Sequence, residues 1–125
     1  MKTVMDAVNY VYGLVKTLGL STFKLTSSGS GERIVVNSLP MTGDILQRCY
    51  VNVCGFVPDI KIPDGAPVPN TKRLAEVESL IVNLVTSHVN SGDIHIYIES
   101  QGVERNPSFD EHFVNVKLKV NLKNP

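Results

Sequence analysis

The stretch DIHIYIESQGVERNPSFDEHFVNVKLKVNLK, residues 93–123, alternates apolar and polar side chains at both of its ends. Isoleucines alternate with His95 and Tyr97, and further on valines and leucines alternate with asparagines and lysines. A two-residue period is typical of a β-strand with one buried face, and Asn106-Pro107 between the two runs is typical of a turn. The stretch therefore predicts a long antiparallel β-hairpin with one apolar face and one polar face.

Aligning the two apolar faces fixes the expected register of this hairpin. A slip of one residue would turn one strand's apolar side chains to solvent, so the register of such a hairpin is strongly specified. The predicted pairs are Ile98 with Val114, Ile96 with Val116, and Ile94 with Leu118.

Two other segments have the period of an amphipathic helix. Residues 3–18 begin with Thr3 as a candidate N-cap and are followed by Gly19 as a left-handed stop, and residues 71–89 form the second segment, with Gly92 just past its end. Gly13 inside the first helix costs about 1 kcal/mol relative to alanine, which predicts a close backbone approach there. The apolar stripes are Val4, Val8, Val11, Val15 and Leu18 in the first helix, and Leu74, Val77, Ile81, Leu84, Val85 and His88 in the second.

Three more strands are predicted between the two helices, separated by a flexible turn region at 27–31 and a break at 40–44. Cys49 and Cys54 of the third strand lie five residues apart, so they point to opposite faces and cannot form a disulfide with each other. Gly55 predicts a bulge or a close approach of another backbone. The predicted strands span residues 20–26, 33–39 and 46–57.

This order predicts a single α+β domain over residues 1–125, with the elements arranged α-β-β-β-α-β-β. About five strands form an antiparallel sheet, in which a mixed arrangement remains possible, and both helices pack on its apolar face.

Residues 58–70 hold four of the seven prolines and show no helical period. Proline cannot donate to a β-ladder, so this segment is not a central strand. It nevertheless carries Ile60, Ile62 and Val68, apolar side chains for which a solvated loop has no need. Long ordered loops of this kind are usually functional, so we expect a contact surface here.

The composition excludes some classes of function. Twelve basic residues balance twelve acidic ones, so the chain lacks the positive field of a dedicated nucleic-acid-binding protein. Asp6 and Asn9 interrupt the N-terminal apolar residues, and no later run is long enough to cross a membrane. We therefore expect a cytoplasmic protein with no membrane partner and no sequence-specific contact to nucleic acid.

No catalytic, cofactor or metal site is predicted. Parity in the hairpin sends His95 and His112 to opposite faces, so only His88 and His112 can share a side. Asp110 and Glu111 beside His112 also alternate in direction and do not converge. The sequence thus predicts a protein that is not an enzyme.

Two groups of charged side chains have alternative interpretations. Lys117 and Lys119 share the polar face of the hairpin with Tyr97, and this row either contacts a partner or is simply solvated. Lys72 and Arg73 lie in the first turn of the second helix, where cations oppose the helix dipole. Either a carboxylate lies nearby or these two side chains are exposed.

Three short motifs accompany the two helices and the closing hairpin: RIVVNSLP at 33–40, YVNVCGFVPD at 50–59 and FVNV at 113–116. Taken in order, these features resemble the tail terminator (tail completion) proteins of long-tailed bacteriophages. The resemblance spans nearly the whole chain. It implies a small subunit that closes into a hexameric ring on the head-proximal end of the tail tube, ends tube polymerisation and joins the head connector.

The resemblance implies partners rather than chemistry: other copies of this chain, the tail tube protein and the head-tail connector protein. The protein would be a monomer or a ring in the host cytoplasm and a ring at the head-proximal end of the virion tail. The side chains expected at its interfaces are Ile60, Ile62, Val68, Lys72, Arg73, Tyr97, Lys117 and Lys119.

Two alternatives stay open. One is a head-to-tail connector or neck protein, which also acts as a small ring. The other belongs to a different class: a cytoplasmic ligand-binding module or an enzyme with a site between subunits, around His95, Tyr97 and Glu99.

Overall fold

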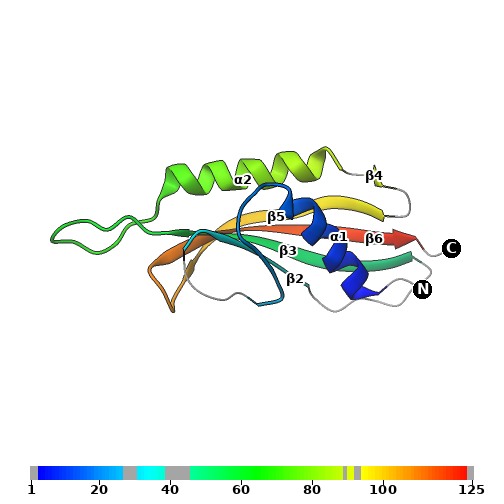
Figure 1. Ribbon diagram of the computed structural model, residues 1–125, viewed down its shortest axis with the longest axis horizontal. Coiled ribbons are helices and arrows are strands. Elements are labelled where there is room, and N and C mark those ends of the chain that lie inside the picture. The colour runs from blue at the N-terminus through cyan, green and yellow to red at the C-terminus, as the bar shows by residue number, and fades with distance from the viewer. Residues whose placement is uncertain (1–2, 27–30, 39–45, 89, 92–93, 124–125) are drawn as a thin grey trace.

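The computed structural model describes residues 3–26, 31–38, 46–88, 90–91 and 94–123. Two helices lie on one face of a six-stranded sheet, which confirms the predicted α+β class (Figure 1). Residues 27–30 of the predicted turn at 27–31, the break at 40–44 and the residues Val89, Gly92 and Asp93 lie outside the described residues. The elements are α1 (Val4–Lys16), β1 (Thr22–Lys24), β2 (Arg33–Ser38), β3 (Leu46–Pro58), α2 (Thr71–Thr86), β4 (Asn90–Ser91), β5 (Ile94–Asn106) and β6 (Glu111–Lys123).

The strands follow the order β1-β2-β3-β6-β5-β4 across the sheet. β1 runs parallel to β2, and all the other neighbours are antiparallel, so the sheet is mixed. The sixth strand, which the sequence did not predict, is the two-residue β4 at one edge. The helices cover the face that bears the valines and leucines of β6, with α1 over β1 to β3 and α2 over β3, β6 and β5.

Both strands of the terminal hairpin are confirmed, but the predicted register is wrong by four residues. Ile98 lies opposite Leu118 rather than Val114. The turn occupies residues 107–110, so its centre lies about two residues later than Asn106-Pro107 predicts. When the turn centre moves by one residue, each residue of β5 pairs with a β6 residue two positions further on. Four is an even number, so the apolar faces stay aligned, and the apolar residues of β6 are buried as expected.

A β-bulge between Ile98 and Ser100 changes which side chains of β5 face the helices. Before the bulge the isoleucines lie on the same face as the buried residues opposite them in β6, which are Leu122, Val120 and Leu118. After it, Gln101 and Val103 take that direction, opposite Val116 and Val114. Because Glu99 is an extra residue in the strand, even-numbered residues of β5 face the helices before the bulge and odd-numbered residues face them after it.

The first helix begins as predicted. The Thr3 side chain accepts a hydrogen bond from the backbone of Asp6, whose carboxylate accepts one from the backbone of Thr3, which completes a capping box. The helix ends at Lys16, two residues before the predicted end, and Gly19 follows with φ +78°. The predicted close approach at Gly13 is wrong, because no atom beyond its chain neighbours and the backbone of its own helix lies within 4 Å of where its Cβ would be.

The close approach lies instead at Gly55, in the middle of the sheet under α2. A Cβ added there would lie 2.5 Å from Cγ1 of Val77. The position is close-packed, but the predicted cause is wrong, because the register of β3 is continuous at Gly55 and the close neighbour is a helix side chain rather than a backbone. Because Gly55 has no side chain, α2 packs closely on β3.

The strand predicted over residues 20–26 is much shorter, because Leu25 has a left-handed backbone with φ +66°. That conformation turns the chain away from β2 after Lys24. The second helix also ends early, at Thr86.

The two cysteines lie on opposite faces of β3, as predicted, and both are free and buried. Burial raises the pKa of each thiol to about 11, with Glu104 adding to the effect at Cys54. At pH 8 both groups are therefore thiols rather than reactive thiolates.

We expect both cysteines to resist iodoacetamide at pH 8 in the folded protein and to react once guanidinium unfolds it. Mass spectrometry of the alkylated protein measures the difference. Rapid modification of either thiol without denaturant would contradict this burial.

Candidate protein-interaction site

Residues 59–70 form an arm that projects from the body beyond the end of the sheet (Figure 1). Its two sides pair at Ile60 and Val68, whose backbone amides each donate to the other's carbonyl at 2.7 and 3.0 Å. Nearer the tip, the amide of Gly65 donates to the carbonyl of Ile62 at 3.2 Å. The segment that the sequence marked only as a proline-rich loop is thus a closed, ordered projection.

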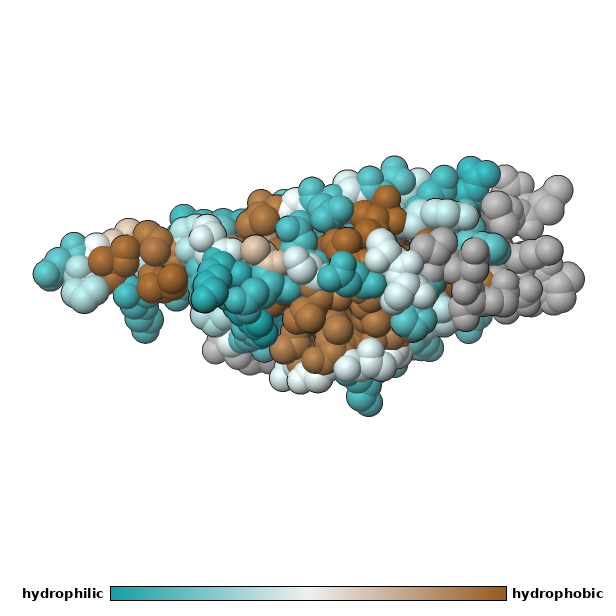
Figure 2. Space-filling view, turned by 90° about the horizontal axis from the view of Figure 1, so that it is seen from above, coloured by the Kyte–Doolittle hydropathy of each residue, from teal (hydrophilic) through white to brown (hydrophobic). Residues whose placement is uncertain are grey.

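Exposed apolar side chains gather at this end of the molecule. Nine large hydrophobic residues are exposed among those described, and five of them lie on the arm or on the nearby end of the β5-β6 hairpin, each 37–54% exposed. Figure 2 shows hydrophobic surface along the arm. Such concentrations on a small protein mark interaction sites. The five are Ile60, Ile62, Val68, Val103 and Phe109.

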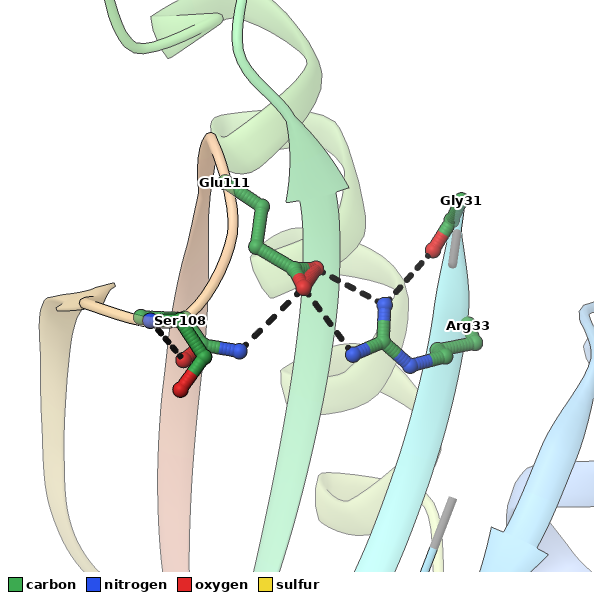
Figure 3. A network of polar contacts seen from close by, with 5 residues as sticks. Gly31, Arg33, Ser108 and Glu111 are labelled. Atoms are coloured by element: carbon green, nitrogen blue, oxygen red, sulfur yellow. Dashed lines mark hydrogen bonds and ion pairs between the residues drawn. The ribbon is translucent and has the colours of Figure 1, made fainter. Parts of the chain in front are cut away.

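A buried ion pair holds the sheet together beside the arm. Two nitrogens of the Arg33 guanidinium donate to the Glu111 carboxylate at 2.7 and 3.0 Å, and the two side chains are only 4% and 3% exposed (Figure 3). Asn106 Nδ2 donates to Glu111 Oε1 at 3.2 Å, and the carbonyl of Gly31 accepts from Arg33 at 2.9 Å. The guanidinium also lies over the Phe56 ring, 4.2 Å from its centroid. This network fixes the start of β2 to the start of β6.

A second pair anchors the root of the arm. Nδ1 of His112 lies 2.7 Å from Oδ1 of Asp59, and the amide of Asp59 donates to the carbonyl of Asp110 at 2.9 Å. Both contacts join the first residue of the arm to the hairpin. Glu111 and His112 thus serve different partners on opposite faces, as strand alternation predicted, and do not form an acid-base cluster.

An open groove of about 350 Å³ lies between the first turns of α2 and the end of the β5-β6 hairpin. The bulge in β5 is what brings Val103 to this side, and His112 lies at the groove next to its contact with Asp59. The lining residues are Pro69, Thr71, Leu74, Ala75, Glu78, Val103 and His112.

Lys72 and Arg73 lie beside the root of the arm, but only Arg73 has carboxylate partners there among the described contacts. The Arg73 guanidinium donates to Glu32 at 2.8 Å and to Glu76 at 2.9 Å, and its hydrogen bond lowers the pKa of the Glu32 carboxyl. The alternative of a nearby carboxylate is therefore confirmed for Arg73. Lys72 is exposed. Arg73 thus helps to fix α2 to the segment before β2, which places it at the edge of the site.

The other predicted interface residues lie on the opposite face of the sheet, which the helices leave open. Tyr97 is directly opposite Lys119, and Lys117 Nζ lies 4.7 Å from the centroid of the Tyr50 ring. The structure therefore separates the predicted residues into two groups: Ile60, Ile62, Val68, Lys72 and Arg73 near the arm, and Tyr97, Lys117 and Lys119 on the open face.

The histidines are spread across the molecule. His95 pairs with Asn121 on the open face, and His112 lies near the N-terminal end of α2. A ring nitrogen of His88 lies 2.9 Å from the carbonyl of Leu84 at the other end of that helix. Over the described ranges, no three His, Cys, Asp or Glu side chains are grouped so that they could hold a metal ion. No helix in the described part of the chain is long and apolar enough to span a membrane.

Sequence reasoning found the apolar residues of the arm but missed Val103, Phe109 and the groove. Phe109 gives a weak signal, since a phenylalanine among the polar residues of a turn has no core to enter. Val103 gives none, because only the bulge decides the face to which it points.

No protein-family model and no curated protein matches this chain. Among solved structures, 22 chains match in fold. One of them, known only by a sequence identifier, is 15% identical and covers 94% of this chain and 88% of its own, with a TM-score of 0.48.

Proposed function

We propose that this chain is a structural protein of a phage tail, a terminator that closes into a hexameric ring, caps the head-proximal end of the tail tube and joins the tube to the head connector. The observation that carries the proposal is the set of five exposed apolar side chains on and beside an anchored arm. The motifs at 33–40, 50–59 and 113–116 resemble those of tail terminators, and this resemblance is the reason for proposing a terminator ring rather than another assembly.

The polar groups near the arm support a structural role. Arg33 is paired with Glu111, and Asp59 with His112, so these charged and titratable groups hold the arm and the hairpin in place. An arm held at its root presents its apolar side chains in one position, which lowers the entropic cost of binding a partner. The arrangement fits a protein that works through its contacts.

We expect the double substitution of Ile60 and Ile62 by serine to leave the fold intact and to abolish ring formation and tube capping. Both side chains are nearly half exposed, so their loss removes little from the core, whereas each buried aliphatic side chain contributes about 1.5–3 kcal/mol to an interface. Electron microscopy of the protein mixed with tail tubes of the same phage measures the effect.

The matched control is Leu80→Ser, which removes an apolar side chain of similar exposure from α2. The wild-type protein and this control should show a ring at one end of each tube. A wild-type protein that ignores tubes would refute the proposed function, and binding to isolated head connectors alone would favour a neck protein instead. Unchanged capping by the double variant would remove the arm from the interface.

A further inference from the structure

We propose that the arm of one subunit binds in the groove between α2 and the β5-β6 hairpin of the next copy of this chain. This inference rests on the proposed function, which supplies the ring, and it names the surface that receives the arm. It makes the contact between neighbours heterologous, with one arm and one groove used by every subunit.

The groove has the chemistry of a receptor for aliphatic side chains. Pro69, Leu74, Ala75 and Val103 supply apolar surface, and only Glu78 contributes a carboxylate. The groove has a volume of about 350 Å³ and is open, so water fills it when no partner is bound. Water against apolar walls is readily displaced by apolar groups.

The arm has the complementary chemistry. Ile60 and Ile62 are two residues apart on an extended segment, so they point to the same side, and both are exposed. Lys61 lies between them and, by the same alternation, points to the other side, so the side that enters the groove is apolar. Pro63 and Pro67 restrict the arm on either side of its tip, so little conformational freedom remains to be lost on docking.

An arm that fills this groove comes from another copy, because the groove lies at the root of the subunit's own arm. Pro69 ends the arm and lines the groove, and Asp59 at the arm's start is bonded to His112 of the groove. From this root the arm runs away from the body (Figure 1). Folding Ile62 back into its own groove would break the Ile60-Val68 pairing that closes the arm.

A heterologous contact of this kind has two possible products. If the rotation between neighbours closes, the subunits form a ring, and if it does not, they form an open filament. The arm and the groove lie at the same end of each subunit, so both contacts of a subunit are made at that end. The arm-to-groove contact is therefore compatible with the hexameric ring of the proposed function.

Crosslinking tests the contact. One pool of protein carries Ile62→Cys and a second carries Ala75→Cys, and the native cysteines are buried and do not interfere. Mild oxidation of the mixed pools, both as concentrated free protein and on tail tubes, should give covalent dimers that neither pool gives alone. A double variant with both substitutions should give a ladder that ends at the hexamer. The control pairs Ile62→Cys with Leu80→Cys and should stay monomeric.

The outcomes separate this inference from the proposed function. Rings on tubes without the Ile62-to-Ala75 crosslink would overturn the docking and leave the terminator role standing. A crosslink in free protein that never binds tubes would establish the docking and refute the terminator role. Absence of the crosslink in both settings overturns the docking whatever the fate of the ring.

Discussion

Replacing Glu111 with alanine should lower the free energy of unfolding by about 3–5 kcal/mol. Arg33 would then keep its charge at a site where it is 4% exposed and has lost its carboxylate. Removing the carboxylate partner of a buried guanidinium is among the most costly changes that a single substitution makes. Guanidinium denaturation followed by circular dichroism measures the loss.

The control for this prediction is the double variant Arg33→Met with Glu111→Leu, which removes both charges and keeps apolar volume. Its stability should lie close to that of the wild type, because a buried pair contributes little beyond an apolar replacement. A loss below about 1 kcal/mol for Glu111→Ala alone would contradict the burial of the pair. It would mean that water reaches both side chains.

The second large effect is expected at Gly55. An alanine there places its Cβ 2.5 Å from Cγ1 of Val77, so α2 or β3 must move. Overpacking of this kind costs about 1–3 kcal/mol. In the Val77→Ala background the same substitution should cost less, because the opposing methyl group is gone, and a double-mutant cycle by denaturation measures this coupling.

Gly13→Ala is the matched control, since this glycine lies in an exposed part of α1 with nothing within 4 Å. Alanine should stabilise the helix there by up to about 1 kcal/mol. The same substitution thus has opposite signs at the two sites. If Gly55→Ala also stabilised the protein, the close packing of α2 on β3 would be wrong.

Much of the fold could be predicted because burial in a strand depends on parity. The faces of β3 and β6 followed from alternation alone, and even a register error of four residues left them correct. The register itself depends on the turn at 107–110 and on the bulge after Ile98, and neither has a strong local signal. Turns and bulges of this kind are settled by tertiary packing.

The site was less predictable. The apolar residues of the arm stood out because prolines exclude them from the core, as Ile60 and Ile62 illustrate. Arg33 and Glu111 are 78 residues apart, and no local pattern pairs them. The groove exists only because α2 lies beside Val103, a contact that requires the folded sheet.

The extra residue in β5 also bears on aggregation. Beyond His95, the outer edge of β5 has no neighbouring strand in the described part of the chain, and long free edges invite other chains to add strands without limit. Here the bulge interrupts the edge, and Glu99, Glu104 and Arg105 place charges along it. Both devices oppose uncontrolled strand addition. A subunit proposed to end one polymer is thereby hindered from starting another.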